Sequence, residues 1–257
     1  MGIGYKELAG VLRSRIEEGR YPDNESKTLP KHEELADEFA VNVKTVRQAV
    51  RLLEAEGLVT VVRRRGTVVR SRPTMRRRGI ERYAKSKWKF GGLVAFAADR
   101  EDSGRSWQLT DQTNTVRKIE ADKEIAEALQ ITQGMPVYER ARLVRYGATP
   151  THTLTSYYRP EDVEGTPLVD PSTGPAGQGG GFMVLTLQGL EPDEITETLY
   201  TRMPKPSEIE ELELPTGEPV MVLERTTRTQ DGRVVEFARG VHAASHFAWS
   251  YTFKIPD

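Results

Sequence analysis

Two groups of side chains in this sequence have the residue types and spacing needed to hold an anion. The first group is Lys44, Thr45, Arg47, Gln48 and Arg51, on one face of a predicted helix. Arg47 can contact a guanine edge through two hydrogen bonds, and Gln48 can contact adenine. Lys44 and Thr45, near the helix start, can hold phosphate. The elements around this helix favour a DNA major groove over an ordinary solvated helix face.

The second group is Arg140 and Arg142, which are two residues apart on a predicted strand. Side chains at that spacing point to the same side of a strand, as a shared anion requires. The alternative is a pair of surface ion pairs with Glu139 or Glu224, which would contribute little to stability. Both interpretations are open from the sequence.

Three predicted helices position the first group. One begins at Tyr5 with an apolar stripe, and a second covers about Lys31 to Phe39 with a mostly acidic exposed face. Asn42 is a good N-cap for the third, because its side-chain oxygen can accept from the free amides of the first turn. This third helix reaches Gly57 and buries the stripe Val43, Val46, Val50 and Leu53.

A hairpin with a basic tip follows the third helix. Leu58 to Val62 and Thr67 to Val69 are β-branched runs separated by Arg63, Arg64, Arg65 and Gly66. Adjacent arginines repel one another unless an anion lies close, and a duplex backbone or minor groove would supply one. The helices and the hairpin together have the layout of a winged helix-turn-helix.

Composition limits the classes of protein that remain. The chain has 257 residues, which predicts two domains, and no cysteine, so disulfides and thiolate metal sites are excluded. No apolar run approaches the roughly 20 residues that span a bilayer, and the first residues lack a signal-peptide pattern. The net charge of -1 hides 21 Lys and Arg against 12 Asp and Glu in residues 1–89. We therefore expect a soluble, intracellular protein whose basic half binds a polyanion.

Residues 5–69 resemble the N-terminal domain of the gluconate-repressor (GntR) superfamily of bacterial transcription regulators. The matching residues are Tyr5, Leu29-Pro30, Glu34-Leu35-Ala36, Thr45 to Ala49, Leu53 to Val59 and Gly66 to Val69. The resemblance and the helix pattern give one set of expected DNA contacts: Lys31, His32, Asn42, Lys44, Thr45, Arg47, Gln48, Arg51, Arg63, Arg64, Arg65 and Gly66.

The chain departs from the family pattern at several of these positions. Lys31 stands where the family usually has serine, Glu33 replaces a basic residue, and Asn42-Val43 replaces Ser-Arg. With two customary arginines missing, we expect Lys44, Arg47 and the basic hairpin tip to carry more of the binding.

A basic stretch joins this domain to the rest of the chain. Residues 70–89 hold nine basic residues and one acid, and Pro73 and Gly79 argue against a continuous helix. We interpret 71–89 as a partly flexible linker between a domain at 1–70 and another at 90–257. It is either a second phosphate contact or a solubilising tether, with Trp88 and Phe90 anchoring its end.

From residue 90 on, the pattern predicts strands interrupted by helices, with a mobile loop over Ser172 to Gly181 and a last strand from Trp249 that closes the sheet. Two stretches repeat: the segment from Glu124 parallels that from Glu208, and an offset of about 83 residues aligns Arg142 with Arg225. Each copy predicts a helix, a glycine turn and a hairpin. Two such units can form one mostly antiparallel sheet with a cleft between the copies.

This region, roughly 85–255, resembles the UTRA ligand-sensing domain of the HutC branch, which has an α+β, chorismate-lyase-like fold. The resemblance implies a small-molecule effector, often a phosphosugar or another acid, with Arg140, Arg142, Tyr157 and Glu236 lining its pocket. Toward the C-terminus the branch commonly has Arg-x-Asp-Arg, where this chain has Ala243-Ala244-Ser245-His246. This departure implies either a different effector or an unused pocket.

Catalytic and metal sites are not expected. His242 and His246 on one strand would lie about 13 Å apart at roughly 3.3 Å per residue, too far to share a metal. Ser156 and His152, four apart on a strand, would not touch, and no acid, base or nucleophile set stands out.

The sequence thus predicts a cytoplasmic, nucleoid-associated bacterial transcription regulator without cofactor or membrane contact. We expect a homodimeric repressor that binds an inverted-repeat DNA operator and is released by a small, anionic effector. The alternatives are a non-sequence-specific architectural DNA-binding protein and a lyase-like enzyme that carries a DNA-binding domain.

Overall fold

The computed structural model describes residues 3–21, 28–62, 66–70, 75–88, 104, 106–176, 180–215, 217–252 and 254–255. Contacts between Cα atoms divide the chain into two compact units. One unit comprises Met1–Pro73 with Leu214–Glu218, and the other comprises Thr74–Glu213 with Pro219–Asp257. No helix in the described ranges is long and apolar enough to cross a membrane.

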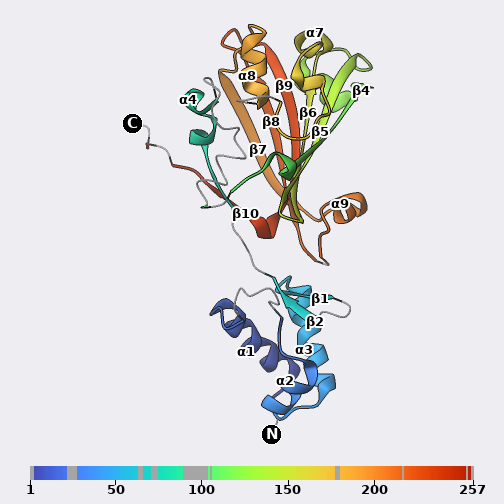
Figure 1. The fold of residues 1–257 in the computed structure, drawn as a ribbon, viewed down its shortest axis with the longest axis vertical. Helices are drawn as coiled ribbons and strands as arrows, with labels where there is room; N and C mark the ends of the chain where they lie inside the picture. Colours follow the sequence, from blue (N-terminus) through green and yellow to red (C-terminus); the bar gives the residue numbers. More distant parts are fainter. Residues whose placement is uncertain are drawn as a thin grey trace. The chain divides into compact units, whose positions relative to one another are not determined.

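The N-terminal unit has the predicted order of elements (Figure 1). Its helices are α1 (Tyr5–Glu17), α2 (His32–Glu38) and α3 (Val43–Ala55). Strands β1 (Val59–Val62) and β2 (Gly66–Val69) pair antiparallel, with Val62 opposite Gly66. The winged helix-turn-helix layout is therefore confirmed for the described residues.

The core of this unit is built from the predicted stripes. Leu8, Leu12, Leu35, Val46 and Leu53 are completely buried and belong to one hydrophobic cluster. Asn42 caps α3, and its Oδ1 accepts from the backbone N–H of Thr45 at 2.8 Å. Packing of α1 and α2 against α3 thus fixes which face of α3 remains exposed.

The C-terminal unit is built on a six-stranded sheet with the order β4-β5-β6-β9-β8-β7. All five strand pairs in it are antiparallel. The strands are β4 (Gln112–Glu120), β5 (Pro136–Tyr146), β6 (Thr149–Tyr158), β7 (Glu194–Arg202), β8 (Val220–Arg228) and β9 (Val234–Ala243).

The internal repeat is confirmed by this strand order. The first copy is β4, helix α6 (Lys123–Leu129), β5 and β6, and the second is β7, helix α9 (Pro206–Glu211), β8 and β9. The copies meet where β6 pairs with β9, with Thr155 opposite Arg239. From either edge of the sheet to its middle, the first, second and third strands of one copy follow in order. This is the pseudo-twofold arrangement that the repeat predicts.

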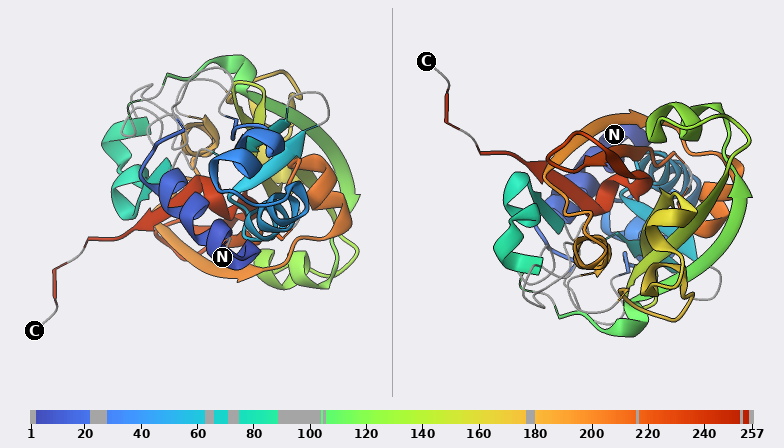
Figure 2. Two further views of the ribbon diagram at one scale, coloured as in Figure 1. Left: turned by 90° about the horizontal axis from the view of Figure 1, so that it is seen from below. Right: turned by 90° about the horizontal axis from the view of Figure 1, so that it is seen from above.

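Helices cover both faces of the sheet. On one face α6 packs over Tyr157, Val234 and Phe237. On the other face are α7 (Pro160–Val163), the 3-10 turn η3 (Pro167–Val169) and α8 (Gly180–Leu187), whose buried residues form a cluster with Tyr158 and Val235. In Figure 2, α8 and the yellow stretch around α7 lie inside the curve of the sheet.

Residues 75–88 differ from the predicted linker. They form β3 (Met75–Arg78), the 3-10 turn η1 (Ile80–Tyr83) and α4 (Lys85–Trp88), and the last strand, β10 (Phe247–Ser250), pairs parallel with β3. The prediction that the last strand closes the main sheet is therefore wrong. Arg77 and Arg82 are buried, so these two arginines are available neither for a phosphate contact nor for a solubilising surface. Trp88 is buried as predicted, whereas Phe90 and the apolar run 94–97 lie outside the described residues.

Candidate DNA-binding surface and effector site

The exposed face of α3 carries the first predicted group. Lys44, Arg47, Gln48 and Arg51 are exposed, while the opposite side of the helix is buried in the core. Thr45 is half-buried, and its Oγ1 lies 3.2 Å from the capping oxygen of Asn42. Because the core fixes α3, these polar side chains project from a rigid element, as groove contacts require.

The charges on this face are free to meet an anion. With other described residues, Lys44, Arg47 and Arg51 form no ion pair. By contrast, Arg13 and Arg15 of α1 pair with Glu56 and Glu38 at 2.6 and 2.7 Å. The arginines of α1 are therefore neutralised by neighbouring carboxylates, whereas those of α3 are not paired with described residues.

The other predicted DNA contacts surround this helix. Lys31 is exposed, and its backbone N–H donates to Glu34 at 3.0 Å. His32 is half-buried, with Nε2 3.5 Å from Thr67 Oγ1. Gly66 is exposed at the start of β2 with φ of 95°, a conformation that favours glycine. Arg63, Arg64 and Arg65 lie outside the described residues.

In the C-terminal unit, Arg140 and Arg142 point to one side of β5, but their contacts differ. Arg140 is 2% exposed, and its Nη1 donates to the backbone oxygens of Pro167, Leu168 and Asp170 at 3.4, 3.1 and 2.5 Å. Arg142 donates to the Leu154 oxygen at 3.0 Å and to the Ser156 hydroxyl. Burial lowers the pKa of both guanidiniums, and the charge of Arg142 lowers that of Arg140 further.

The alternative of surface ion pairs for these arginines is wrong. Glu139 accepts instead from Arg117 Nε at 3.0 Å, and Glu224 accepts from the Tyr200 hydroxyl at 2.9 Å. Glu139 alternates with Arg140 along β5, and Glu224 alternates with Arg225 along β8, so both carboxylates lie on the other face of the sheet.

Glu236 is a buried carboxylate on the arginine side of the sheet. Only 2% exposed, it accepts from Ser156, Tyr158 and Thr227 hydroxyls at 2.6, 2.8 and 3.2 Å, and from Arg225 at 2.8 and 3.1 Å. Burial opposes its ionisation, but the charges of Arg225 and Arg142 and the hydroxyl donors outweigh burial and keep its pKa low. Glu236 therefore remains a carboxylate that organises the surrounding donors.

Tyr157 lies on the opposite face. Its ring stacks on Phe237 with centroids 6.0 Å apart, under α6. The cause is an irregularity in the β5–β6 pairing at Val144 and Arg145, which shifts the register by one residue and places Ser156 opposite Arg140. A one-residue shift turns every side chain of the strand beyond it to the other face, so Tyr158 rather than Tyr157 lies beside Glu236.

Arg225 is the functional candidate that motif matching missed. Its signal was the repeat, in which Arg225 corresponds to Arg142 in the other copy. The structure brings both guanidiniums to Glu236, Arg225 directly and Arg142 through the Ser156 hydroxyl. The repeat thus produces an arginine from each copy around one carboxylate.

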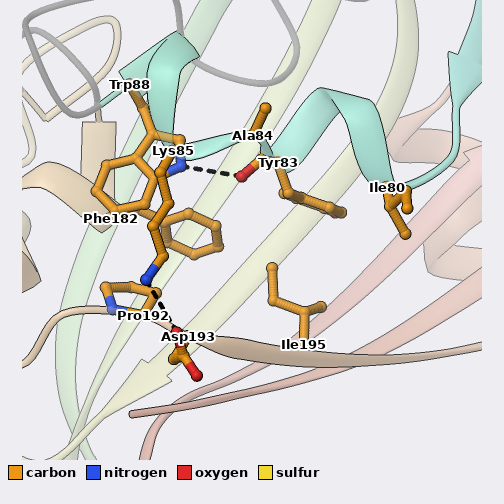
Figure 3. Close-up of a pocket in the computed structure, with 9 residues that line it drawn as sticks. All are labelled: Ile80, Tyr83, Ala84, Lys85, Trp88, Phe182, Pro192, Asp193 and Ile195. Atoms are coloured by element: carbon orange, nitrogen blue, oxygen red, sulfur yellow. Dashed lines mark hydrogen bonds and ion pairs between the residues drawn. The ribbon is translucent and has the colours of Figure 1, made fainter. Parts of the chain in front are cut away.

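A pocket of about 320 Å³ lies near this network, within the size range of small-molecule sites. Its walls come from η1, α4, α8 and the start of β7 (Figure 3). Its lining is mostly apolar and aromatic: Ile80, Tyr83, Ala84, Lys85, Trp88, Phe182, Pro192, Asp193 and Ile195.

Histidines do not form a metal site in the described part of the chain, where no group of three His, Asp or Glu side chains could hold an ion. His242 stacks instead on His152, with ring centroids 4.7 Å apart and planes 6° apart. The Ser156 hydroxyl donates to Glu236, so its partner is a carboxylate and not His152.

Comparisons with known proteins agree with both units. The pattern of the bacterial regulatory proteins of the gntR family matches residues 4–69, and that of the UTRA domain matches residues 108–248. An HTH-type transcriptional regulator of Streptomyces coelicolor is 51% identical over 98% of this chain and 93% of its own length.

More distant relatives have lower sequence identity but match nearly the whole chain as well. The HTH-type transcriptional repressor NagR of Bacillus subtilis is 24% identical over 95% of this chain and 92% of its own length. The crystal structure of PhnF from Mycobacterium smegmatis covers 97% of this chain and 100% of that one, with a TM-score of 0.58 and 19% identity, which is a likeness of fold alone.

Proposed function

The chain belongs to the GntR family of bacterial regulatory proteins and carries a UTRA domain, and from that premise we propose that it is an operator-specific repressor. It binds an inverted repeat as a homodimer, with α3 of each subunit in a major groove. A small anionic effector binds the C-terminal unit and releases the DNA. The alignment with the repressor NagR covers 95% of this chain and 92% of NagR, which supports the choice of repression.

The observation that carries the DNA assignment is the face of α3. One side of this helix is fixed in the core, and Lys44, Arg47 and Arg51 project from the other side. None of these three residues forms an ion pair with an acidic residue that the structure describes. Arg47 and Gln48 are the candidates for base contacts, because both side chains can make paired hydrogen bonds to purine edges. The predicted contributions of Arg63, Arg64 and Arg65 remain part of this proposal.

Selection of bound duplexes from a random pool tests this assignment. We expect an inverted repeat to emerge, and Arg47→Ala to weaken binding to it by at least about 30-fold, because each of the two subunits loses a base contact of about 1–3 kcal/mol. Lys123→Ala is the matched control, because it removes an exposed positive charge from the other unit. An unchanged affinity of Arg47→Ala for the selected duplex would contradict the recognition role of this residue.

The same selection separates this proposal from its rivals. An architectural DNA-binding protein would yield no preferred repeat and would lose affinity uniformly with salt. An enzyme would turn over the small molecule that it binds, whereas a regulator returns it unchanged.

The buried positive charges on one side of the sheet are the reason for proposing an anionic effector. Arg140, Arg142 and Arg225 face the same side of the sheet, and the charge of Arg225 further lowers the pKa of the buried Arg142. Such mutual repulsion is reduced when an anion binds nearby. Native mass spectrometry of the purified protein should therefore detect a retained acidic metabolite; a neutral retained molecule that releases the operator would contradict an anionic effector.

A further inference from the structure

Residues 249–255, here called the C-terminal segment, have a strand pattern that β10 uses only in part. From Trp249 to Ile255 the sequence Trp-Ser-Tyr-Thr-Phe-Lys-Ile alternates at every step between an apolar and a polar side chain. Such alternation is typical of a strand with one buried face. Strand β10 nevertheless ends at Ser250, so only the first two residues of the C-terminal segment belong to a strand.

The apolar side of the C-terminal segment begins inside its own unit and becomes exposed farther along. The Trp249 ring lies 5.1 Å from that of His242 and 5.5 Å from that of Phe247. Beyond β10, Tyr251 is 47% exposed and Ile255 is 89% exposed. In Figure 1 and in Figure 2 the described residues after β10 lead away from the other strands and helices of the unit. The buried face that the alternation predicts is therefore absent from the described part of this unit.

Strand β10 also has an unpaired edge. Among the described residues it pairs only with β3, in parallel, with Ser250 opposite Arg78. An edge strand presents unpaired N–H and C=O groups that can bond another chain, and charged side chains commonly prevent such pairing. The other edge strands of this unit carry charged residues: Arg117, Lys118 and Glu120 in β4, Glu194, Glu197 and Arg202 in β7, and Arg76, Arg77 and Arg78 in β3. With the sequence Phe-Ala-Trp-Ser, β10 has none, so no charge of its own opposes a further strand.

A second copy of the C-terminal segment has the features that this edge requires. Two identical strands can pair antiparallel about a twofold axis, and each then supplies the backbone groups that the other leaves unpaired. With the axis at Thr252, Lys254 of one copy lies opposite the uncharged Ser250 of the other, so like charges do not meet. The same register places Ile255 opposite Trp249, a pairing of a β-branched with an aromatic side chain that stabilises sheets.

We infer that two copies of this chain pair through their C-terminal segments, antiparallel about a twofold axis near Thr252. The two small sheets then become one, with the strand order β3-β10-β10-β3 and the apolar side chains of both segments on one face. The presence of a second copy rests on the homodimer proposed above, whereas the choice of surface does not. Because β3 is the first element of this unit in the sequence, the interface would join the two copies close to where each DNA-binding domain is attached.

Sedimentation equilibrium of the full-length protein tests this interface. Ile255→Lys should raise the dissociation constant of the dimer by about 100-fold, because both copies lose the burial of a large apolar side chain. The Ile255 side chain is 89% exposed, so its replacement should leave the fold of the unit intact. Leu187→Lys is the matched control, because it places the same charge at an apolar position that is 71% exposed at the end of α8. This control should leave the dissociation constant unchanged.

Disulfide formation locates the twofold axis. The chain has no cysteine, so a single introduced thiol can form a disulfide only with its counterpart in another copy. Residues 250–254 are replaced by cysteine one at a time and oxidised under mild conditions. A residue on the axis lies opposite itself at about 4.5–5.5 Å between Cα atoms, which suits a disulfide, whereas a residue two positions away is roughly 13 Å from its counterpart. We therefore expect one maximum, at Thr252→Cys, with a steep fall on either side.

Operator selection separates this interface from the proposed function. If Ile255→Lys dimerises as tightly as the unmodified protein and still binds the selected inverted repeat, the function is supported and the interface is overturned. Disulfide formation that is equal at all five positions, or absent from all of them, also overturns the interface, because the segment then packs on its own unit or on a different protein. If one position dominates but no inverted repeat is selected, the interface is supported and the operator-specific function fails.

Discussion

Arg140 differs from Arg225, on the same side of the sheet, because backbone oxygens rather than a carboxylate surround it. Its Nη1 contacts the oxygens of Pro167, Leu168 and Asp170, and so fixes η3 and the turn that follows. Removing the guanidinium would leave buried acceptors unsatisfied, at about 1–3 kcal/mol each. Arg140 is therefore a structural residue as well as a source of positive charge.

We predict that Arg140→Met lowers the free energy of unfolding by about 2–4 kcal/mol, because it removes these donors. Arg140→Lys keeps the charge and one donating group, so its loss should be roughly half as large. Urea denaturation followed by circular dichroism measures both. Equal stability of Arg140→Met and the unmodified protein would show that water satisfies these oxygens.

At Glu236 the residue-scale prediction concerns pH. Glu236→Gln leaves Arg225 without its buried anion and should cost about 3–5 kcal/mol at pH 7. Since the folded pKa of Glu236 is low, its stabilising contribution is full above the unfolded value of about 4.3 and is lost as pH falls toward the folded pKa. The difference between Glu236→Gln and the unmodified protein should therefore shrink below about pH 4. Glu139→Gln, whose partner Arg117 is mostly exposed, should cost under about 1 kcal/mol.

At the scale of elements, α3 depends on its cap. Asn42→Ala removes the acceptor for the Thr45 amide and should lower the unfolding free energy by about 1 kcal/mol, whereas Asn42→Ser keeps an acceptor and should stay near the original value. Thermal unfolding measures the difference. If Asn42→Ser is destabilised as much as Asn42→Ala, contacts of Asn42 other than the cap stabilise this turn.

Elements with local signals were predictable, and elements whose partners are distant were not. The Asn42 cap and the apolar stripe of α3 each lie within a short window, so they predict the N-terminal unit. The repeat is visible as two similar segments about 83 residues apart, and it predicts the sheet. In β3, Arg77 looks like part of a charged linker because its partners, Glu197 and His242, lie more than 100 residues away. Helix α8 was missed because GGFMVLTL has no polar face whose period could indicate a helix.

The residues of the candidate site divide in the same way, into those that a local pattern predicts and those that only the fold brings together. The exposed face of α3 follows directly from its period, so the structure places Lys44, Arg47, Gln48 and Arg51 as expected. Tyr158 in place of Tyr157 depends on the irregular pairing at Val144, which no residue pattern indicates. The hydrogen bonds of the Tyr83 hydroxyl join η1, β3, β7 and β8, and only the folded sheet brings these together.

For the whole molecule, the excess of positive charge in residues 1–89 is not spread over the DNA-binding domain. Residues 1–70 hold 13 Lys and Arg against 11 Asp and Glu, and residues 71–89 hold eight against one. Within the latter stretch Arg77 and Arg82 are buried in the C-terminal unit. Affinity for DNA should therefore come from a few placed contacts on α3 and the hairpin tip rather than from net charge.

Lys44→Ala tests the placed contact and the proposed dimer together. Each phosphate contact contributes about 0.9 to the slope of log K against log salt concentration. A homodimer loses two contacts when Lys44 is replaced, so the slope should become shallower by about 1.8, against about 0.9 if a single chain binds. Titrations of the selected operator between roughly 50 and 200 mM salt resolve that difference. Lys123→Ala should leave the slope unchanged, because this exposed lysine belongs to the sheet domain. An unchanged slope for Lys44→Ala would remove Lys44 from the phosphate contacts, and a change near 0.9 would favour binding by one chain.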